Sequence, residues 1–201
     1  MEAQNDLRYI KVEEAIRQAF LKLLAQKPVD QISVSEICQE ARCSRNAFYG
    51  HHASRDQLCA DMLNEFEQTL RKACADEIAH LKTGVSKTEA LASALIEAIH
   101  AHETFLRVLF QSDNGVFAFS LFGVVERSYL NALEDILKAS DARAFELHIA
   151  YTAAGAVGFA QRWLLGENDF DRAREAFISM QVPISDSIEG DVLRILEAKP
   201  K

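Results

Sequence analysis

The chain has 201 residues, 49% of them hydrophobic, which is enough to bury a substantial core in one or two domains. Its three prolines, eight glycines and scarce strand-like alternation favour an all-helical protein over one built on a sheet. The net charge of −8 excludes a uniformly basic protein, so contact with a polyanion would be confined to one part of the chain.

The first expected helix spans residues 6–26 and is amphipathic. Apolar residues recur at helical spacing along one face: Val12, Ile16, Ala19, Phe20, Leu23 and Leu24. Pro28 ends this helix, because the residue before a proline avoids helical geometry. The polar, acidic N-terminus lacks the apolar run of a signal peptide, so we expect a cytoplasmic protein whose four cysteines are free thiols.

Residues 32–58 contain three signals for the start of a helix. Serines with capping potential stand at Ser33 (with Glu36 three residues on), Ser44 and Ser54 (with Gln57 three residues on). Residues 41–44 interrupt the apolar pattern before a short helix over 45–50. Two short helices joined by a four-residue turn predict a helix-turn-helix, with polar residues outward on the second helix.

This stretch resembles the DNA-binding domain of the tetracycline-repressor (TetR) family of bacterial regulators. The matching features are the Ile-Ser-Val-Ser-Glu-Ile opening, the Ala-x-Cys-Ser turn, Phe48-Tyr49 followed by His51, and the Ser-Arg-Asp-Gln-Leu start of the next helix. The resemblance implies an all-α protein, with a three-helix helix-turn-helix DNA-binding domain at 1–58 and a helical effector-binding and dimerisation domain at 59–201. It also implies a sequence-specific transcriptional regulator, which we expect to be a repressor released from its operator by a small apolar ligand.

The charge distribution agrees with DNA contact at one end of the protein. Residues 1–58 carry eight basic and eight acidic side chains, whereas residues 59–201 carry 14 and 22. An acidic body with a neutral head suits binding through a few placed cations and helix N-termini.

The second helix of the motif is expected in the major groove of double-stranded DNA, with its first residues at the base edges. The candidate base contacts are Ser44, Arg45, Asn46 and Ala47, since arginine prefers guanine and asparagine pairs with adenine. The candidate backbone contacts are Ser33, Ser35 and Arg42, and the resemblance adds Tyr49, His51 and Arg55. A merely solvated surface is the alternative for any one of them.

Two positions depart from the family pattern. Arg42 occupies a turn position that usually holds glycine, and left-handed backbone geometry costs an arginine free energy. His52 replaces an aromatic residue that usually packs beneath the motif. We interpret His52 as a partly buried, hydrogen-bonded histidine.

The rest of the chain is expected to form further helices. Their ranges are 54–81, 86–100, 102–111, 116–138, 140–165, 168–182 and 186–198, which makes 140–165 the eighth helix and 168–182 the ninth. The most apolar stretch, 149–165, is too short for a membrane span and contains Gln161 and Arg162.

Phenylalanines are concentrated between residues 105 and 122. Core packing is one interpretation of this cluster, and an apolar ligand cavity, as in the family, is the other. The candidate ligand-binding residues are Phe66, Leu70, Leu95, Ile99, Phe105, Leu109, Phe117, Leu121, Phe122 and Tyr151.

The eighth helix is apolar nearly all round and rich in alanine and glycine, ending in Gly158 to Trp163. Small residues let another backbone come close, so we expect a homodimer in which helices 8 and 9 meet their copies as a four-helix bundle. A core helix of a monomer is the alternative. A two-fold dimer would bind a palindromic operator.

Other classes of function have weaker support. Cys38, Cys43, His51, His52 and Cys59 match no zinc spacing, so we expect no metal and no cofactor. A redox switch through Cys43 or Cys59 would need an exposed, reactive thiol. The sequence shows no nucleophile–base set, so we expect no enzyme; a helical ligand-binding or interaction module that has lost specific DNA binding is the main rival.

Overall fold

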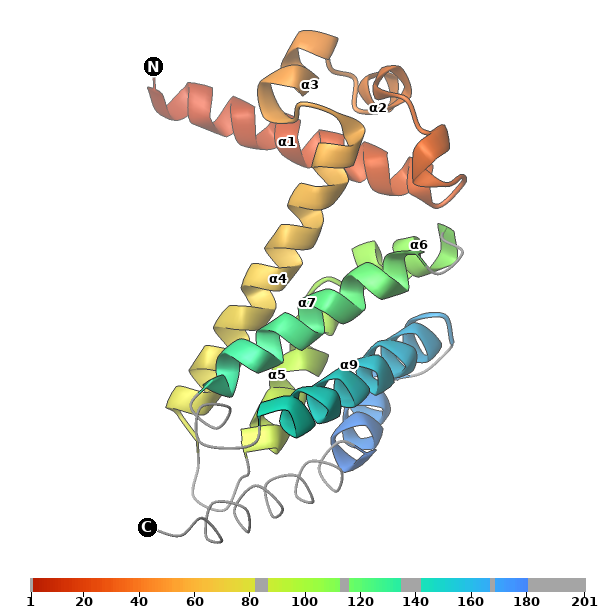
Figure 1. Ribbon diagram of the computed structural model, residues 1–201. Helices are drawn as coiled ribbons and strands as arrows, with labels where there is room; N and C mark the ends of the chain where they lie inside the picture. Colours follow the sequence, from red (N-terminus) through yellow and green to blue (C-terminus); the bar gives the residue numbers. More distant parts are fainter. Residues whose placement is uncertain (1, 82–86, 113–115, 135–141, 167–168, 181–201) are drawn as a thin grey trace, which may run out of the picture. The chain divides into compact units, whose positions relative to one another are not determined.

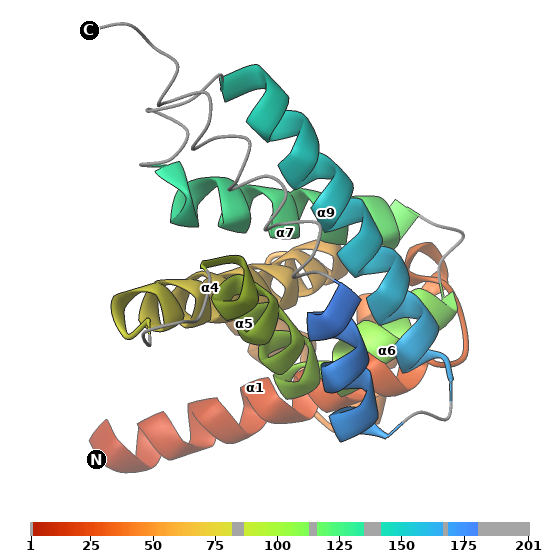
Figure 2. The same cartoon turned by 90° about the horizontal axis from the view of Figure 1, so that it is seen from below.

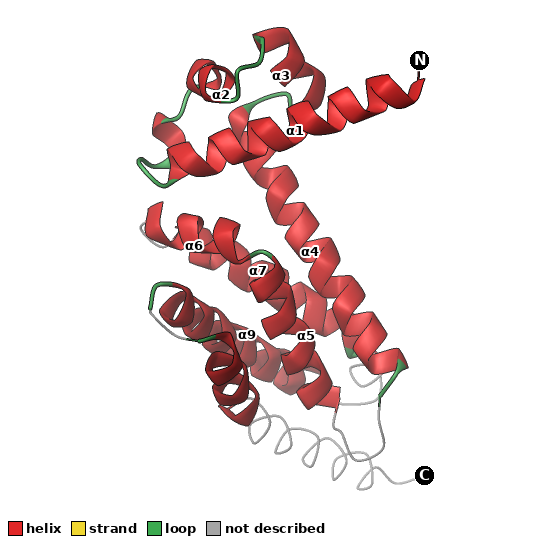
Figure 3. Cartoon of the chain, turned by 180° about the vertical axis from the view of Figure 1, so that it is seen from behind, coloured by secondary structure: helices red, strands yellow, loops and turns green. Residues whose placement is uncertain are grey.

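The computed structural model describes residues 2–81, 87–112, 116–134, 142–166 and 169–180. Every regular element in these ranges is helical, and no strand occurs in them (Figure 3). The all-α prediction is therefore confirmed for the described part of the chain.

Figure 1 shows the helices in chain order. They are α1 (Glu2–Leu24), the 3-10 turn η1 (Val29–Gln31), α2 (Val34–Glu40), α3 (Arg45–His51), α4 (Arg55–Ala79), α5 (Lys87–Ala101), α6 (Glu103–Ser112), α7 (Val116–Ala132), α9 (Ala142–Leu164) and a helix over 170–180. Most bounds agree with the sequence prediction to within a few residues. The expected helix 186–198 and the predicted end of α7 at residue 138 lie outside the described residues.

The chain divides into two compact units. The first unit comprises residues 1–65 and 104–114, and the second unit comprises residues 66–103 and 115–201. Helix α4 supplies its first turns to the first unit and its remaining turns to the second. The domain boundary after residue 58 stays a prediction.

The core of the first unit lies where α1 meets α2 and α3. Its fully buried side chains are Ile16, Phe20, Leu24, Ile32, Ile37, Phe48 and Leu58. Each of these side chains stabilises the fold by about 1.5–3 kcal/mol relative to an exposed one. Because Phe48 is the buried residue of α3, the opposite face of that short helix is left for solvent.

The core of the second unit is broader and almost entirely apolar. Helix α7 packs along α9 (Figures 1 and 2), and α5 buries residues on most of its circumference. The buried polar groups here are few: the Tyr129 hydroxyl donates to the Leu91 carbonyl at 3.3 Å, and Ser128 donates to Val124 at 2.8 Å. Trp163, near the end of α9, is 4% exposed and lies beside Phe170.

Candidate nucleic-acid interface

Helices α2 and α3 begin at the capping residues that the sequence predicted. The Ser33 hydroxyl accepts from the Glu36 amide at 3.3 Å, and the Glu36 carboxylate accepts from the Ser33 amide at 2.9 Å, which completes the capping box. The Ser44 hydroxyl accepts from the Ala47 amide at 3.1 Å and so caps α3. These caps satisfy backbone donors that a helix start leaves unpaired, and they fix where each short helix begins.

At the start of α4, only the cap half of the predicted box is present. The Ser54 hydroxyl accepts from the Gln57 amide at 3.0 Å. The Gln57 side chain instead donates to Asp61 Oδ1 at 2.8 Å, so it does not complete the box with Ser54.

The turn between α2 and α3 contains the one non-glycine residue with positive φ among the described residues, Arg42, at φ 52°. Its amide donates to the Gln39 carbonyl at 3.3 Å, and the Cys43 amide donates to the Cys38 carbonyl at 3.0 Å. These two bonds and the left-handed residue define a Schellman motif, in which glycine usually takes the left-handed place. The expected left-handed geometry of Arg42 is confirmed, and it costs about 1–2 kcal/mol in an L-residue other than glycine.

The outer face of the motif is polar and exposed. Arg45 and Asn46, in the first turn of α3, are exposed, and Tyr49 is 56% exposed. A guanidinium nitrogen of Arg45 donates to the Ser35 hydroxyl, so the polar sides of α2 and α3 are joined on one surface. This surface can present hydrogen-bond donors to a groove or a phosphate chain.

Arg55 has intramolecular partners at the start of α4. Its Nη1 donates to the Asp30 carbonyl at 2.6 Å and to the Ile32 carbonyl at 2.7 Å, and its Nε donates to Asp56 at 3.1 Å. Arg55 therefore ties the start of α4 to the turn before α2. A phosphate contact by Arg55 stays a prediction, and it would compete with these bonds.

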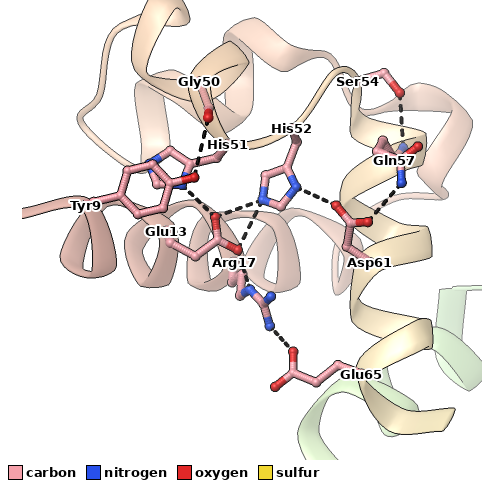
Figure 4. Close-up of polar contacts among 10 residues, drawn as sticks. All are labelled: Tyr9, Glu13, Arg17, Gly50, His51, His52, Ser54, Gln57, Asp61 and Glu65. Carbon is pink, nitrogen blue, oxygen red and sulfur yellow. Dashed lines mark hydrogen bonds and ion pairs between the residues drawn. The ribbon is translucent and has the colours of Figure 1, made fainter. Parts of the chain in front are cut away.

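His52 lies at the centre of a polar network behind the motif (Figure 4). The residue is 4% exposed, with Nδ1 2.8 Å from Asp61 Oδ2 and Nε2 2.9 Å from Glu13 Oε2. Each ring nitrogen of His52 therefore faces a carboxylate oxygen, one from α4 and one from α1. The interpretation of His52 as a buried, hydrogen-bonded histidine is confirmed.

The network extends from α1 to α4 through charged partners. Arg17 Nε donates to Glu13 Oε1 at 2.6 Å, and Arg17 also pairs with Glu65 (Figure 4). Burial alone would raise the pKa of Asp61, but hydrogen bonds from Gln57 and His52 outweigh it and hold that pKa below its usual value. The network thus holds α1, the end of α3 and α4 by directional contacts.

His51 lies against Tyr9 of α1 with its ring covered. The two rings stack at 3.8 Å between centroids, and the His51 side chain is 4% exposed. Its Nδ1 lies 3.0 Å from Glu13 Oε2 and has no hydrogen-bond partner among the described residues. A phosphate contact by His51 stays a prediction. Sequence reasoning missed Tyr9, whose only signal is an aromatic residue on the outer face of α1.

Two lysines near the motif are paired with carboxylates of α2. Lys27 Nζ lies 2.6 Å from Glu36, and Lys22 Nζ lies 2.5 Å from Glu40. The hydrogen bond from Lys27, followed by those from the backbone and hydroxyl of Ser33, lowers the pKa of Glu36 to about 2. Two of the eight basic side chains of residues 1–58 are therefore paired with carboxylates of the same segment.

The predicted ligand-binding residues fall into several environments. Phe66, Leu70, Leu95, Ile99 and Leu121 are buried in the second unit, Phe105 and Leu109 are buried on α6, Phe122 is half-buried, and Tyr151 is 67% exposed. The Phe117 side chain lies outside the described residues. The exposed position of Tyr151 places it on a surface, whereas the cavity itself stays a prediction.

Two hollows of the second unit are lined by other residues. One, of about 270 Å³, is lined by Phe159, Arg162, Trp163, Arg172, Ala173 and Ala176. The other, of about 410 Å³, is lined by Arg71, Ala75, Ile78, Ala79, Ser128, Asn131 and Ala132. Within the described ranges, no group of three or more His, Cys, Asp or Glu side chains is arranged to hold a metal ion.

The outer face of α9 is apolar and exposed. Leu147 is 69% exposed, Tyr151 is 67% exposed, and exposed alanine and glycine follow them on α9; Leu165, directly after the helix, is 45% exposed. A Cβ added at Gly158 would meet no heavy atom within 4 Å, so open space lies beside this glycine. Among the helices that the structure describes, none is long and apolar enough to cross a bilayer.

Comparison with protein families gives a match at the helix-turn-helix. The family model described as "Bacterial regulatory proteins, tetR family" matches residues 16–62. Two curated relatives, both HTH-type transcriptional regulators of Bacillus subtilis that remain uncharacterised, are YxbF, 33% identical over 89 residues, and YuxN, 41% identical over 54 residues. The matches cover 44% and 27% of this chain and 22% and 19% of the relatives, so the similarity spans about a fifth of each relative's length.

Solved structures share the fold over most of the chain. NalD of Pseudomonas aeruginosa, named as the secondary repressor of the MexAB-OprM efflux pump, has a TM-score of 0.59 and 18% identity, and the match covers 87% of this chain and 96% of NalD. The regulator SCO0857 of Streptomyces coelicolor has a TM-score of 0.59 at 17% identity, covering 87% and 94%. The dihydroxyacetone kinase operon activator DhaS has a TM-score of 0.57 at 18% identity, covering 86% and 94%. At this identity the likeness shows the fold alone.

Proposed function

Because the chain belongs to the tetR family of bacterial regulatory proteins, we propose that it is a dimeric repressor that binds a palindromic operator and leaves it when a small apolar ligand binds. The observation that carries the proposal is the capped helix-turn-helix, whose short second helix buries Phe48 and exposes Arg45, Asn46 and Tyr49. A helix that is short, capped and polar on one face fits the major groove.

The proposed roles follow from what each side chain can donate. Arg45 would exchange its bond to Ser35 for guanine O6 and N7, and Asn46 would pair with adenine. Ser35, Tyr49 and Arg42 would contact phosphates. Ser33 and Ser44 already accept backbone amides as caps, so they would act through the placement of their helices.

The exposed apolar face of α9 supports the proposed dimer. With the helix over 170–180, it would pack against the same surface of a second copy, and Gly158 would let the two backbones come close. A two-fold pair would present two α3 helices to successive major grooves, about 34–36 Å apart. A ligand that binds a different spacing more tightly would shift the population away from DNA.

The sign of regulation is a further part of the proposal. The neighbours of similar fold include both a named repressor, NalD, and a named operon activator, DhaS. A reporter gene behind the protein's own upstream region decides between the two signs. Expression that rises when the chain is deleted supports repression, and expression that falls supports activation.

The DNA-binding proposal is tested by gel shifts on DNA from the protein's own upstream region. Arg45→Ala should weaken specific binding by roughly 1–3 kcal/mol, because a bidentate base contact is lost. Lys72→Ala removes one positive charge from an exposed position of α4 in the second unit and serves as the matched control. Unchanged affinity after Arg45→Ala, or the absence of a salt-sensitive specific complex, would favour the rival module without DNA recognition.

A further inference from the structure

Two cysteines meet at the turn of the helix-turn-helix. In a Schellman motif, the third-last residue of the helix and the third residue after the helix commonly bring their side chains into contact. Here these positions are Cys38 and Cys43, joined by the backbone bond from the Cys43 amide to the Cys38 carbonyl at 3.0 Å. The left-handed Arg42 between them closes the turn.

Both thiols are free, and Cys43 is close enough to Cys38 to act on its pKa. Cys38 is 6% exposed, whereas Cys43 is half-buried and is the more exposed residue of the pair. Burial raises the pKa of the Cys38 thiol, its neighbour Cys43 adds to this shift, and the nearby Arg45 opposes it. An accessible thiol beside a buried one is the arrangement of an attacking cysteine and a resolving cysteine.

The other two cysteines lack such a partner arrangement in the described structure. Burial raises the pKa of Cys59 to about 11 and that of Cys74 to about 12. A raised pKa lowers the fraction of reactive thiolate, so both thiols are poor nucleophiles.

We propose that Cys38 and Cys43 are a disulfide-forming pair that reacts with hydroperoxides. The Cys43 sulfur attacks one peroxide oxygen, the O–O bond breaks, and water leaves with the thiol proton, which gives a sulfenic acid. The Cys38 sulfur then attacks the Cys43 sulfur, the S–O bond breaks, and a second water leaves. The two thiols lose two electrons, and one hydrogen peroxide is reduced to two waters.

The bond would alter the start of the recognition helix. The two sulfurs must approach to about 2.05 Å to form a disulfide. Cys43 directly precedes Ser44, the cap of α3, so this approach moves the cap and Arg45 with it. Oxidation therefore weakens operator binding, and this consequence rests on the DNA-binding function proposed above.

The chemical step is tested by peptide mapping of the full-length protein. After treatment with hydrogen peroxide and alkylation of the remaining thiols, trypsin cleaves after Arg42, between the two cysteines. We expect the two peptides to stay linked until a reductant separates them. Recovery of both cysteines alkylated, or a link that involves Cys59 in place of either, overturns the proposal.

The regulatory consequence is tested by operator affinity with and without peroxide. We expect oxidation to lower affinity about tenfold or more, the scale of one lost base contact, and a reductant to restore it. Cys43→Ser and Cys38→Ala should abolish this response, and Cys59→Ser is the matched control that retains it. A response that survives in Cys43→Ser overturns the assignment. If the reduced protein binds no operator, the DNA-binding proposal fails, while peptide mapping still decides the chemistry of the pair.

Discussion

The two units of this protein are stabilised by different kinds of contact. The first unit has a small apolar core and adds helix caps and a network of ion pairs around His52. The second unit has a broad apolar core on α5, α7 and α9, with few buried polar groups among its described residues. Apolar burial is non-directional, whereas hydrogen bonds fix orientation. The polar contacts of the first unit therefore fix the orientation of the short helix α3.

The largest expected effect comes from a cavity beneath α3. Phe48→Ala should lower the free energy of unfolding by about 3–5 kcal/mol and abolish operator binding, because this side chain is the buried anchor of α3. Leu91→Ala, in the core of the second unit, should lower it by about 2–5 kcal/mol and leave operator affinity intact wherever the protein stays folded. Denaturant titration and gel shifts measure both quantities. Equal loss of binding in the two variants would contradict the contrast between the units.

Breaking the polar network should have a smaller effect. Glu13→Gln removes the charge that faces His52 and Arg17, so it should lower the free energy of unfolding by about 1–2 kcal/mol. Glu14→Gln changes the same chemical group at the next, exposed position of α1 and should have little effect. Chemical denaturation of the two variants compares them directly. If both behave alike, directional contacts do not distinguish the first unit.

A substitution in the Schellman turn should raise the free energy of unfolding instead of lowering it. Arg42→Gly should relieve the left-handed strain and raise the free energy of unfolding by about 1 kcal/mol or less, because glycine also gains freedom in the unfolded chain. Glu40→Gly, in the last turn of α2, should instead destabilise by about 1 kcal/mol. Thermal unfolding of the two variants measures the sign of each stability change. A loss of stability in Arg42→Gly would mean that the arginine side chain makes a stabilising contact that outweighs the strain.

The smallest effect is the acid dependence of the α2 cap. The Lys27 and Ser33 contacts lower the pKa of Glu36 to about 2, below its usual value of 4.5. The folded state therefore binds this proton less readily than the unfolded state, so the contribution is fully present above about pH 4.5 and is lost as pH falls towards about 2. Glu36→Gln should flatten this acid limb in a series of urea midpoints. An unchanged pH profile would show that Glu36 is not the source of this acid dependence of stability.

The sequence predicted the local features and missed the long-range ones. The caps at Ser33 and Ser44, the left-handed Arg42 and the burial of His52 follow from residues close together in the chain or from the motif itself. The stacking of Tyr9 on His51 joins residues 42 positions apart, and the bonds from Arg55 to the 30–32 turn likewise depend on the packing of helices. No local pattern specifies such contacts.

Prediction from the sequence has a similar limit in the second unit. Helical periodicity predicts which side of α4 or α5 is buried, and Phe66, Leu70, Leu95 and Ile99 are buried accordingly. Periodicity does not state whether buried side chains fill the space between helices or leave a cavity. It also missed the outward position of Tyr151, because a helix that is apolar all round gives no phase for its exposed face.

Trp163 is the chain's single tryptophan, and it is buried near the end of α9 in the second unit. Tryptophan emission is therefore a reporter for that unit alone, and melting of the helix-turn-helix leaves it largely silent. Far-ultraviolet dichroism reports the helices of both units, so it includes the melting of the first unit that tryptophan emission misses. A mismatch between the two signals during denaturation would separate the unfolding of the two units in a single unmodified protein.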